Sequence, residues 1–404
     1  MVKLSFTGIV ALVSVILYAI ILTSLEILVV YFHHTFVDQF NLDRRGDGIS
    51  EADLIYHAIF ILSLAFQVLL CVDALWRKNS MQLIALVLYN ILSLVYAGVQ
   101  LYQHMILEDV GTENATFIPQ DPSKFPTAEF TRQFFIKRMR PLEYVIIGIV
   151  TAFSGYLAAL SFKLTREFGW EVYRTYSADV KVRDAFRSLS ILQTLIKLDI
   201  FFIGAYAIQL IPSQSIGYSN SIAETIIIFF VGTIMLLMAW YSIMQESKYI
   251  LLCVINLLAL SLIYMVYRLI SINISQHTDG GYDPYEFTRR LLSFFLATTI
   301  CLVLATIFYA VKCFKNMMQG LYIFAAYGLP GQDQNVPEIN QNNHNQNRQN
   351  SFNSEYLGYN GYNGYNGYTE NNNLAPSDSQ KKSKRASKIA EVQSARLSRR
   401  ISID

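Results

Sequence analysis

The chain alternates between long apolar runs and short polar stretches, and this pattern governs its predicted fold. A helix needs about 20 apolar residues to cross the hydrocarbon core of a bilayer, and eight runs reach that length. Within lipid, every backbone N–H and C=O must find a partner in its own segment, so each run is predicted to be a helix. The runs are Phe6–Phe32, Leu54–Leu75, Met81–Met105, Leu142–Phe162, Leu189–Ile211, Ala223–Met244, Tyr249–Ile270 and Leu291–Val311. We therefore predict an all-α, polytopic transmembrane bundle of about eight helices over residues 1–315.

The first run lies where a cleavable signal peptide would lie, yet its pattern is that of a retained helix. A signal peptide has an apolar core of about 7 to 15 residues, followed by a cleavage site with small residues. Phe6–Phe32 is much longer, and no small-x-small site follows it. We therefore count it as a membrane span.

Composition agrees with a membrane protein. Hydrophobic residues make up 53% of the chain and charged residues 15%, against roughly 25% charged in soluble domains. The net charge of +2 is an average over unlike parts, because residues 381–400 hold eight Lys or Arg against a single Glu. We expect membrane lipids rather than nucleic acid as partners. The four cysteines lie in or beside apolar runs and share no loop, so no disulfide framework is predicted.

Lys and Arg in short loops predict which side faces the cytoplasm. The second connection carries Arg77 and Lys78, and residues 163–188 hold six basic side chains against four acidic ones. These loops are predicted to be cytoplasmic, and with eight spans both termini are cytoplasmic as well. Basic residues before the fourth and eighth spans argue the other way: Lys137, Arg138, Arg140, Arg289 and Arg290.

Two glycosylation sequons provide an independent check on this orientation, since such sites are used only in the secretory lumen. They begin at Asn114 and Asn273, and both fall in loops that the charge pattern places outside the cytoplasm. We predict both asparagines to be glycosylated.

Histidines gather at the predicted luminal ends of the spans. His33 and His34 end the first span, His57 starts the second and His104 ends the third, while His277 lies in the last luminal loop. Asp53 precedes His57 by four residues, so the two share a helical face, as metal ligands or a carboxylate-oriented imidazole would.

No HExxH motif is present, and His and Asp are common at membrane interfaces. We expect no cofactor. Asp53, His57 and His104 are the candidate ligands if a metal is bound, and a pH-sensing role in an acidic lumen is equally open.

Ionisable residues within the spans are candidate functional groups, because their burial in lipid is costly. Glu26, Glu224 and Arg268 lie toward the luminal ends of their spans and are predicted to form one interhelical network. Lys197 and Asp199 are about 200° apart around a helix, so each needs a partner elsewhere. Structural ion pairs and a transport pathway both fit this pattern.

The C-terminal region, residues 316–404, is predicted to be a disordered cytoplasmic tail. From Gln332 it is rich in Asn and Gln, and the repeat Gly-Tyr-Asn follows three times over residues 358–366. Such a segment cannot bury enough apolar surface to offset its ordering entropy. Ser387 and Ser402 follow basic residues and are phosphorylation candidates. Cys313, before the tail, is either a lipidation site or a buried thiol.

Residues 163–188 are predicted to be a cytoplasmic amphipathic connector, because Phe168, Val172, Tyr176 and Val180 recur every four residues. Such a connector suits either packing under the bundle or binding a cytoplasmic partner.

The connector and the fifth span also carry a family resemblance. The residues are Arg166-Glu167-Phe168-Gly169-Trp170, Tyr173, Ala178-Asp179 and Leu195-Ile196-Lys197-Leu198-Asp199-Ile200-Phe201-Phe202. They resemble the signature of an uncharacterised fungal family of Golgi apparatus multi-pass membrane proteins, although Leu198 and Ile200 stand where the family more often has phenylalanine. The resemblance implies a helical bundle in the Golgi membrane. It implies no activity.

We therefore expect a multi-pass protein of the Golgi or endomembrane system that is non-enzymatic and interacts with partners or lipid. A transporter or receptor-like bundle is the first alternative, and it predicts that Glu26, Lys197, Asp199 and Arg268 line one cavity. A luminal, membrane-embedded metal hydrolase is the second, and it predicts bound zinc that is lost when His57 is replaced.

Overall fold

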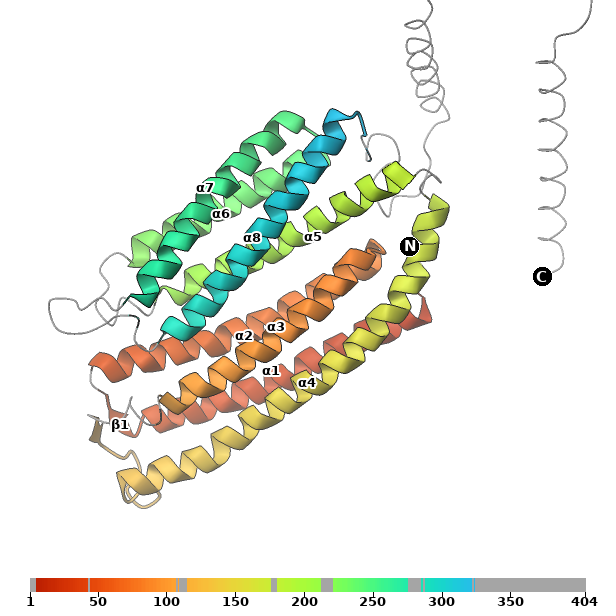
Figure 1. Ribbon diagram of the computed structural model, residues 1–404. Coiled ribbons are helices and arrows are strands. Elements are labelled where there is room, and N and C mark those ends of the chain that lie inside the picture. Colours follow the sequence, from red (N-terminus) through yellow and green to blue (C-terminus); the bar gives the residue numbers. More distant parts are fainter. Residues whose placement is uncertain are drawn as a thin grey trace, which may run out of the picture. The chain divides into compact units, whose positions relative to one another are not determined.

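The computed structural model describes residues 5–42, 44–106, 108, 115–175, 180–211, 221–274, 285, 288–321 and 323. Over these residues the chain is helical apart from a two-stranded pairing. In chain order the elements are α1 Phe6–Val37, β1 Phe40–Asn41, α2 Arg44–Trp76, α3 Ser80–Ile106, β2 Thr116–Phe117, α4 Ala128–Thr175, α5 Val180–Gln209, α6 Ser221–Met244, α7 Lys248–Asn273 and α8 Arg289–Met318 (Figure 1). Eight of the described helices are long and apolar enough to cross a membrane. The predicted all-α transmembrane bundle is confirmed.

The helices are longer than the apolar runs within them, and α4 shows this most clearly. Its 48 residues extend over about 72 Å at a rise of 1.5 Å per residue, whereas a hydrocarbon core is about 30 Å thick. Pro141 lies inside the helix, and Figure 1 shows α4 curving along its length. Proline removes one backbone hydrogen bond and bends a helix without always ending it.

The 163–188 connector is therefore not a separate element. Its first half continues α4 to Thr175 and its second half begins α5 at Val180, while residues 176–179 lie outside the described residues. The polar residues after Phe162 end the apolar run without ending the helix.

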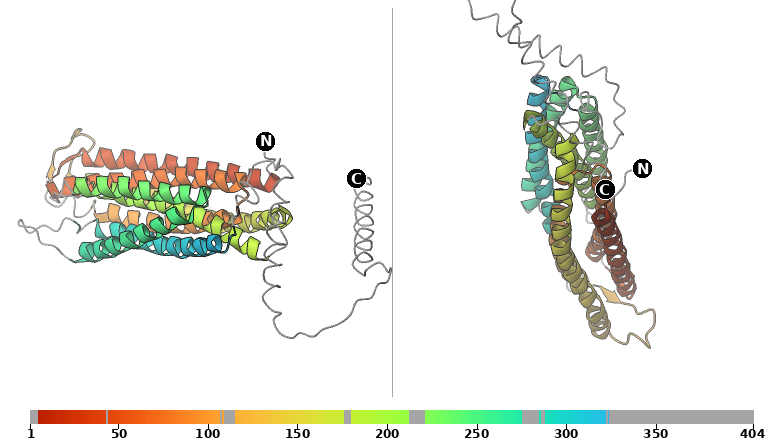
Figure 2. Two further views of the ribbon diagram at one scale, coloured as in Figure 1. Left: turned by 90° about the horizontal axis from the view of Figure 1, so that it is seen from above. Right: turned by 90° about the vertical axis from the view of Figure 1, so that its right-hand side faces the viewer.

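The helices form two groups, α1–α4 and α5–α8, that run alongside one another (Figures 1 and 2). Each group has a buried core; Leu22, Phe60 and Val150 lie in the first and Leu236, Leu258 in the second. Aromatic rings join the groups, since Phe201 of α5 stacks on Phe66 of α2 at 4.7 Å and Phe295 of α8 meets Tyr96 of α3 at 5.4 Å. Apolar side chains on the outside of α1 are about half exposed, as suits a surface covered by lipid. They are Ile9, Leu17, Ile20 and Ile27.

One end of the bundle, called here the strand end, carries the β-strands. Phe40 of β1 pairs with Phe117 of β2 in antiparallel register, and Phe36 and Phe135 pack close by with Met139. The charge pattern predicts that this end is luminal. The opposite end of the bundle contains the α2–α3 turn, the start of α1 and the C-terminal end of α4. There Ser5 and Thr7 both donate to the carboxylate of Glu167 at 2.8 Å, which ties α1 to α4.

Candidate metal centre

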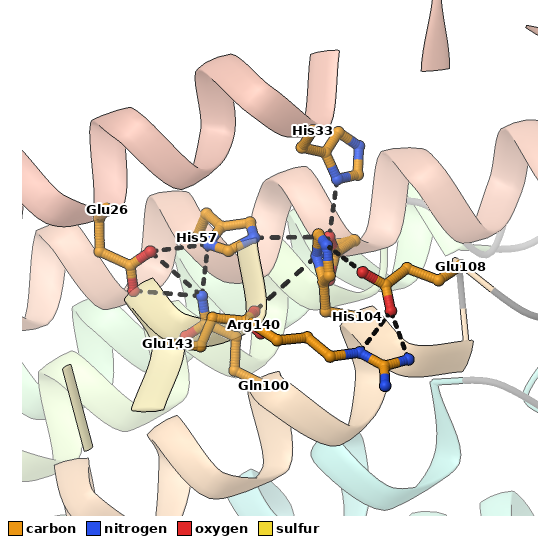
Figure 3. Close-up of polar contacts among 9 residues, drawn as sticks. Glu26, His33, His57, Gln100, His104, Glu108, Arg140 and Glu143 are labelled. Carbon is orange, nitrogen blue, oxygen red and sulfur yellow. Dashed lines mark hydrogen bonds and ion pairs between the residues drawn. The ribbon is translucent and has the colours of Figure 1, made fainter. Parts of the chain in front are cut away.

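Four buried side chains from three helices meet near the strand end. His33 lies near the end of α1, Asp53 and His57 lie in the first part of α2, and His104 lies in the last turn of α3. Consecutive helices run in opposite directions, so the end of one lies beside the start of the next. Asp53 and His57, four residues apart, share the face that α2 turns to its neighbours. All four residues have no solvent exposure, and Figure 3 shows the three rings converging.

The three imidazoles surround a single carboxylate oxygen of Asp53. Oδ2 of Asp53 lies 2.9 Å from Nδ1 of His33, 3.4 Å from Nε2 of His57 and 3.0 Å from Nδ1 of His104. One ligand atom from each residue lies within 4.8 Å of all the others. Metal–ligand bonds of about 2.0–2.1 Å place tetrahedral ligands about 3.3 Å apart. The three distances from Asp53 Oδ2 are close to this spacing.

Two of the imidazoles also have an outer partner on the second ring nitrogen. His33 Nε2 lies 3.1 Å from the hydroxyl of Ser50, and His57 Nδ1 lies 2.8 Å from Oε2 of Glu26. His104 Nε2 has no hydrogen-bond partner within the described structure and lies 3.8 Å from Oε1 of Glu108. Metal-ligating histidines commonly use one nitrogen for the metal and hold the other on a carboxylate or another polar group, which fixes the tautomer and the ring orientation.

The outer partners are themselves held in place. Gln100 on α3 donates to Oε1 of Glu26 at 3.2 Å and also contacts Nδ1 of His57. Arg140 on α4 binds Glu108 through two nitrogens, at 2.9 and 2.7 Å. Residues of all four helices in the first group are thus connected through this cluster (Figure 3).

The cluster contains more negative than positive fixed charge. The cluster includes four carboxylates, on Glu26, Asp53, Glu108 and Glu143, and one guanidinium, on Arg140. With neutral imidazoles their formal charge is four minus one, or three negative. Because buried charge is costly unless it is paired, protons or a bound cation must supply the balance.

Glu143 on α4 is the least satisfied of these carboxylates. It is 5% exposed, and within the described structure neither side-chain oxygen has a hydrogen-bond partner. Its Oε1 lies 3.9 Å from Nδ1 of His104. A buried carboxylate so placed is available to a cation or to a proton at the centre.

The predicted candidates Asp53, His57 and His104 thus lie together, and the structure adds His33. The neighbouring His34 is excluded from the cluster, because its side chain is 70% exposed and pairs with Asp38 at 2.9 Å. His277 lies outside the described residues. No sequence motif marks Glu108, Glu143 or Arg140 as part of a site. Arg140 was noted only as a basic residue that argues against the predicted orientation, and its partner in the structure is the buried Glu108.

The predicted network of Glu26, Glu224 and Arg268 is wrong for Glu26. That residue belongs to the histidine cluster, whereas Arg268 of α7 pairs with Glu224 of α6 at 2.5 Å and donates to the hydroxyl of Tyr285 at 3.1 Å. Residues at similar depth in lipid need not share a face, and α1 is packed on α2 and α4.

Lys197 and Asp199 have separate partners, as predicted. The Lys197 ammonium contacts Asp73 of α2 and lies 3.0 Å from Oε1 of Gln82 on α3. Asp199 accepts a hydrogen bond of 2.6 Å from the hydroxyl of Thr306 on α8. Glu26, Lys197, Asp199 and Arg268 thus each contact a different set of partners. The arrangement argues against the single polar cavity that the transporter alternative predicts.

The residues that carry the family resemblance connect helices. Glu167 holds the start of α1, Lys197 joins α5 to α2 and α3, and Asp199 joins α5 to α8. Phe201 and Phe202 lie in the aromatic junction between the two groups. Their contacts explain why this stretch bears on the fold of the whole bundle, and they include no feature specific to a reaction.

The modification candidates are only partly described. Asn273 is the exposed last residue of α7, and its amide donates to the carbonyl of Leu269 at 2.8 Å and to the hydroxyl of Ser293 at 2.9 Å. Asn114, Ser387 and Ser402 lie outside the described residues. The thiol of Cys313 is buried at 3% exposure, which supports the buried-thiol alternative.

Comparison with known proteins gives one informative match. The chain is 22% identical over 287 residues to a UPF0658 Golgi apparatus membrane protein of Schizosaccharomyces pombe, covering 65% of this chain and 75% of the relative. No family model matches the chain, and no solved structure matches it. The resemblance predicted from the sequence is confirmed as distant homology to a multi-pass membrane protein family of unknown function.

Proposed function

We propose that this distant homologue of the UPF0658 Golgi membrane proteins resides in the Golgi membrane and binds one divalent transition-metal ion through His33, Asp53, His57 and His104. One observation carries the proposal. Each of the three imidazoles turns one ring nitrogen toward Asp53, and those of His33 and His57 have a polar partner on the other.

A cation explains the arrangement better than hydrogen bonds from neutral imidazoles. His57 lies between the carboxylates of Glu26 and Asp53, and His104 lies between those of Asp53 and Glu108. A neutral imidazole has one N–H and one lone pair, so it can donate to only one of two carboxylates. The other nitrogen then directs its lone pair at a negative oxygen. A metal ion among the four inner atoms turns this repulsion into ligation.

The ligand set indicates the class of metal. Three imidazole nitrogens and one carboxylate oxygen suit Zn²⁺ and related ions, whereas Ca²⁺ and Mg²⁺ prefer shells of oxygen. All four ligands come from the protein and none is exposed to solvent. A closed set of this kind is typical of a structural ion, which here would fasten α1, α2 and α3 together. This supports a non-enzymatic role and replaces the expectation that no cofactor is bound.

A metal-dependent hydrolase is the second candidate, and Glu143 is the observation that favours it. A metal ion can supply an activated water molecule as a nucleophile, and a carboxylate beside the centre could accept its proton. Glu143 has the required position near His104. Against this role, a catalytic centre leaves one ligand position open, while the four inner residues are fully buried.

Metal analysis of the purified full-length protein tests the proposal. After growth in zinc-supplemented medium, we expect about one equivalent of metal by inductively coupled plasma mass spectrometry. His104→Ala and Asp53→Ala should retain less than about a tenth of it, because each removes one of four ligands. His34→Ala is the matched control and should retain the metal. Equal metal in all four proteins, or none in the wild type, would contradict the proposal.

A difference in hydrolysis would separate the two candidates. If Glu143→Gln keeps the metal and the protein shows no metal-dependent release of a lipid acyl chain or headgroup, the structural role stands. Metal-dependent hydrolysis that is lost in Glu143→Gln would favour the enzyme.

We also infer that both termini face the cytoplasm, together with the end of α4, the start of α5 and the C-terminal tail, where protein partners can bind. The basic residues of these segments support this orientation. It predicts that glycosidase treatment increases gel mobility, and that Asn114→Gln with Asn273→Gln abolishes the shift. An unchanged mobility of the wild-type protein would remove the support of the sequons.

A further inference from the structure

The opposite end of the bundle contains a basic cavity that has no role in the metal centre. Its volume is about 500 Å³, and it lies among the α2–α3 turn, the end part of α4 and the start of α5. Lys78, Arg183 and Arg187 line it together with one carboxylate, Asp184. That carboxylate pairs with Lys312 of α8 at 3.0 Å. Among the described lining residues there are therefore three positive charges against one negative charge, which favours an anionic ligand.

An apolar groove of about 450 Å³ lies between α3 and α5. Its α3 side is formed by residues spaced three or four apart, including Ile84, Leu88 and Ile91, which are 46%, 56% and 44% exposed. Its α5 side includes Leu195 and Leu198. Both helices are membrane spans, so the groove opens toward lipid rather than toward water.

The cavity and the groove adjoin one another. Met81 lines both, and on α5 Ser190 lines the cavity while the adjacent Ile191 lines the groove. From Met81 to Leu92 the groove follows α3 over 12 residues, and the 11 steps between them extend about 16 Å at a rise of 1.5 Å per residue. This is close to half of a hydrocarbon core of about 30 Å. The groove thus has the depth of one leaflet.

We infer that this site binds an anionic phospholipid, with its phosphate headgroup in the basic cavity and an acyl chain in the groove. A soluble phosphate compound would use the cavity alone and leave the groove unexplained. A neutral lipid would use the groove and leave the basic lining unexplained. The leaflet predicted here is the cytoplasmic one, which is rich in anionic lipid. The inference is independent of the proposed metal ion.

Native mass spectrometry of the purified full-length protein can test the site, with phosphatidylserine and phosphatidylcholine as probes. We expect the wild type to retain phosphatidylserine preferentially. Arg183→Gln combined with Arg187→Gln should weaken its binding roughly tenfold, because hydrogen bonds to a charged group are lost. Lys181→Gln is the matched control, since this exposed basic residue of the same helix is not part of the cavity lining. Replacing both arginines with lysine should preserve most of the binding and verifies that the fold tolerates substitution there.

Two further arms identify the ligand. Leu195→Trp fills the groove and should weaken phosphatidylserine binding while leaving the basic cavity intact. Glycerophosphoserine, which has the headgroup and no acyl chains, should compete poorly. The basic C-terminal tail is common to all variants, so only differences between variants count. Equal binding by the double glutamine variant, a neutral effect of Leu195→Trp, or full competition by glycerophosphoserine would each overturn the assignment.

Discussion

The two helix groups use buried polar residues in different ways. In α1–α4, nine polar side chains form one connected cluster with three histidines around Asp53 (Figure 3). In α5–α8, polar contacts include the pair of Arg268 with Glu224 and the hydrogen bond of Thr306 to Asp199, while Lys197 reaches Asp73 of α2. A local pair is explained by the need to satisfy a polar group in lipid. A cluster with excess negative charge requires a further positive species, and this difference assigns the candidate chemistry to the first group.

Removing a metal ligand should have the largest effect and should affect only the first group's centre. We expect His57→Ala to lose most of the bound metal and to lower the thermal unfolding temperature in detergent, since binding a metal to the folded state stabilises it. Added chelator should lower the unfolding temperature of the wild type and leave that of His57→Ala unchanged. An identical response of both proteins to chelator would contradict the account.

Lower pH should also release the metal, because protons compete for imidazole and carboxylate ligands.

Breaking the main ion pair of the second group should destabilise the protein without changing its metal content. Arg268→Met leaves Glu224 without its guanidinium, and removal of one partner of a buried pair typically costs about 3 kcal/mol. The side chains of Arg268 and Glu224 are 6% and 13% exposed, so solvent relieves little of this cost. Chemical unfolding monitored by tryptophan fluorescence measures the loss. A parallel fall in metal content would show that the two groups are not independent.

The division between the groups could be predicted from the sequence only in part. Apolar runs of about 20 residues identify the eight spans, and a four-residue spacing places Asp53 and His57 on one face. The meeting of His33 with His104 depends on how α1, α2 and α3 pack, which periodicity does not determine. Glu143 lies next to the predicted start of the fourth span, where a glutamate suits a membrane interface. The sequence therefore did not indicate that its side chain is buried. The extension of α4 through Pro141 was equally hidden, because charged residues end the apolar run there.

An outer partner of the centre should have an intermediate effect. Glu26→Gln keeps the size of the side chain but weakens the acceptor for Nδ1 of His57. Loss of such a partner typically reduces metal affinity 10- to 100-fold, and competition with a fluorescent zinc chelator measures this change. Glu224→Gln provides the contrasting control in the second group. Equal zinc affinity of wild type and Glu26→Gln would remove Glu26 from the centre.

The smallest effect is expected at the hydrogen bond between α5 and α8. Thr306→Val deletes the donor to Asp199, 2.6 Å away, and should cost about 1–3 kcal/mol, because a buried carboxylate loses its partner. Thr299→Val is the matched control on the same helix, since its hydroxyl bonds the carbonyl of Phe295 within α8. Unfolding measurements should show a smaller loss for the control. If both variants lose the same stability, the bond to Asp199 contributes nothing specific.

The most direct test of the central claim is X-ray absorption spectroscopy of the zinc-loaded full-length protein. The account predicts a four-coordinate ion with only nitrogen and oxygen neighbours at about 2.0–2.1 Å, and outer-shell scattering from three imidazole rings that falls to two in His104→Ala. Sulfur neighbours at about 2.3 Å, or a spectrum without imidazole scattering, would contradict a centre built from His33, Asp53, His57 and His104.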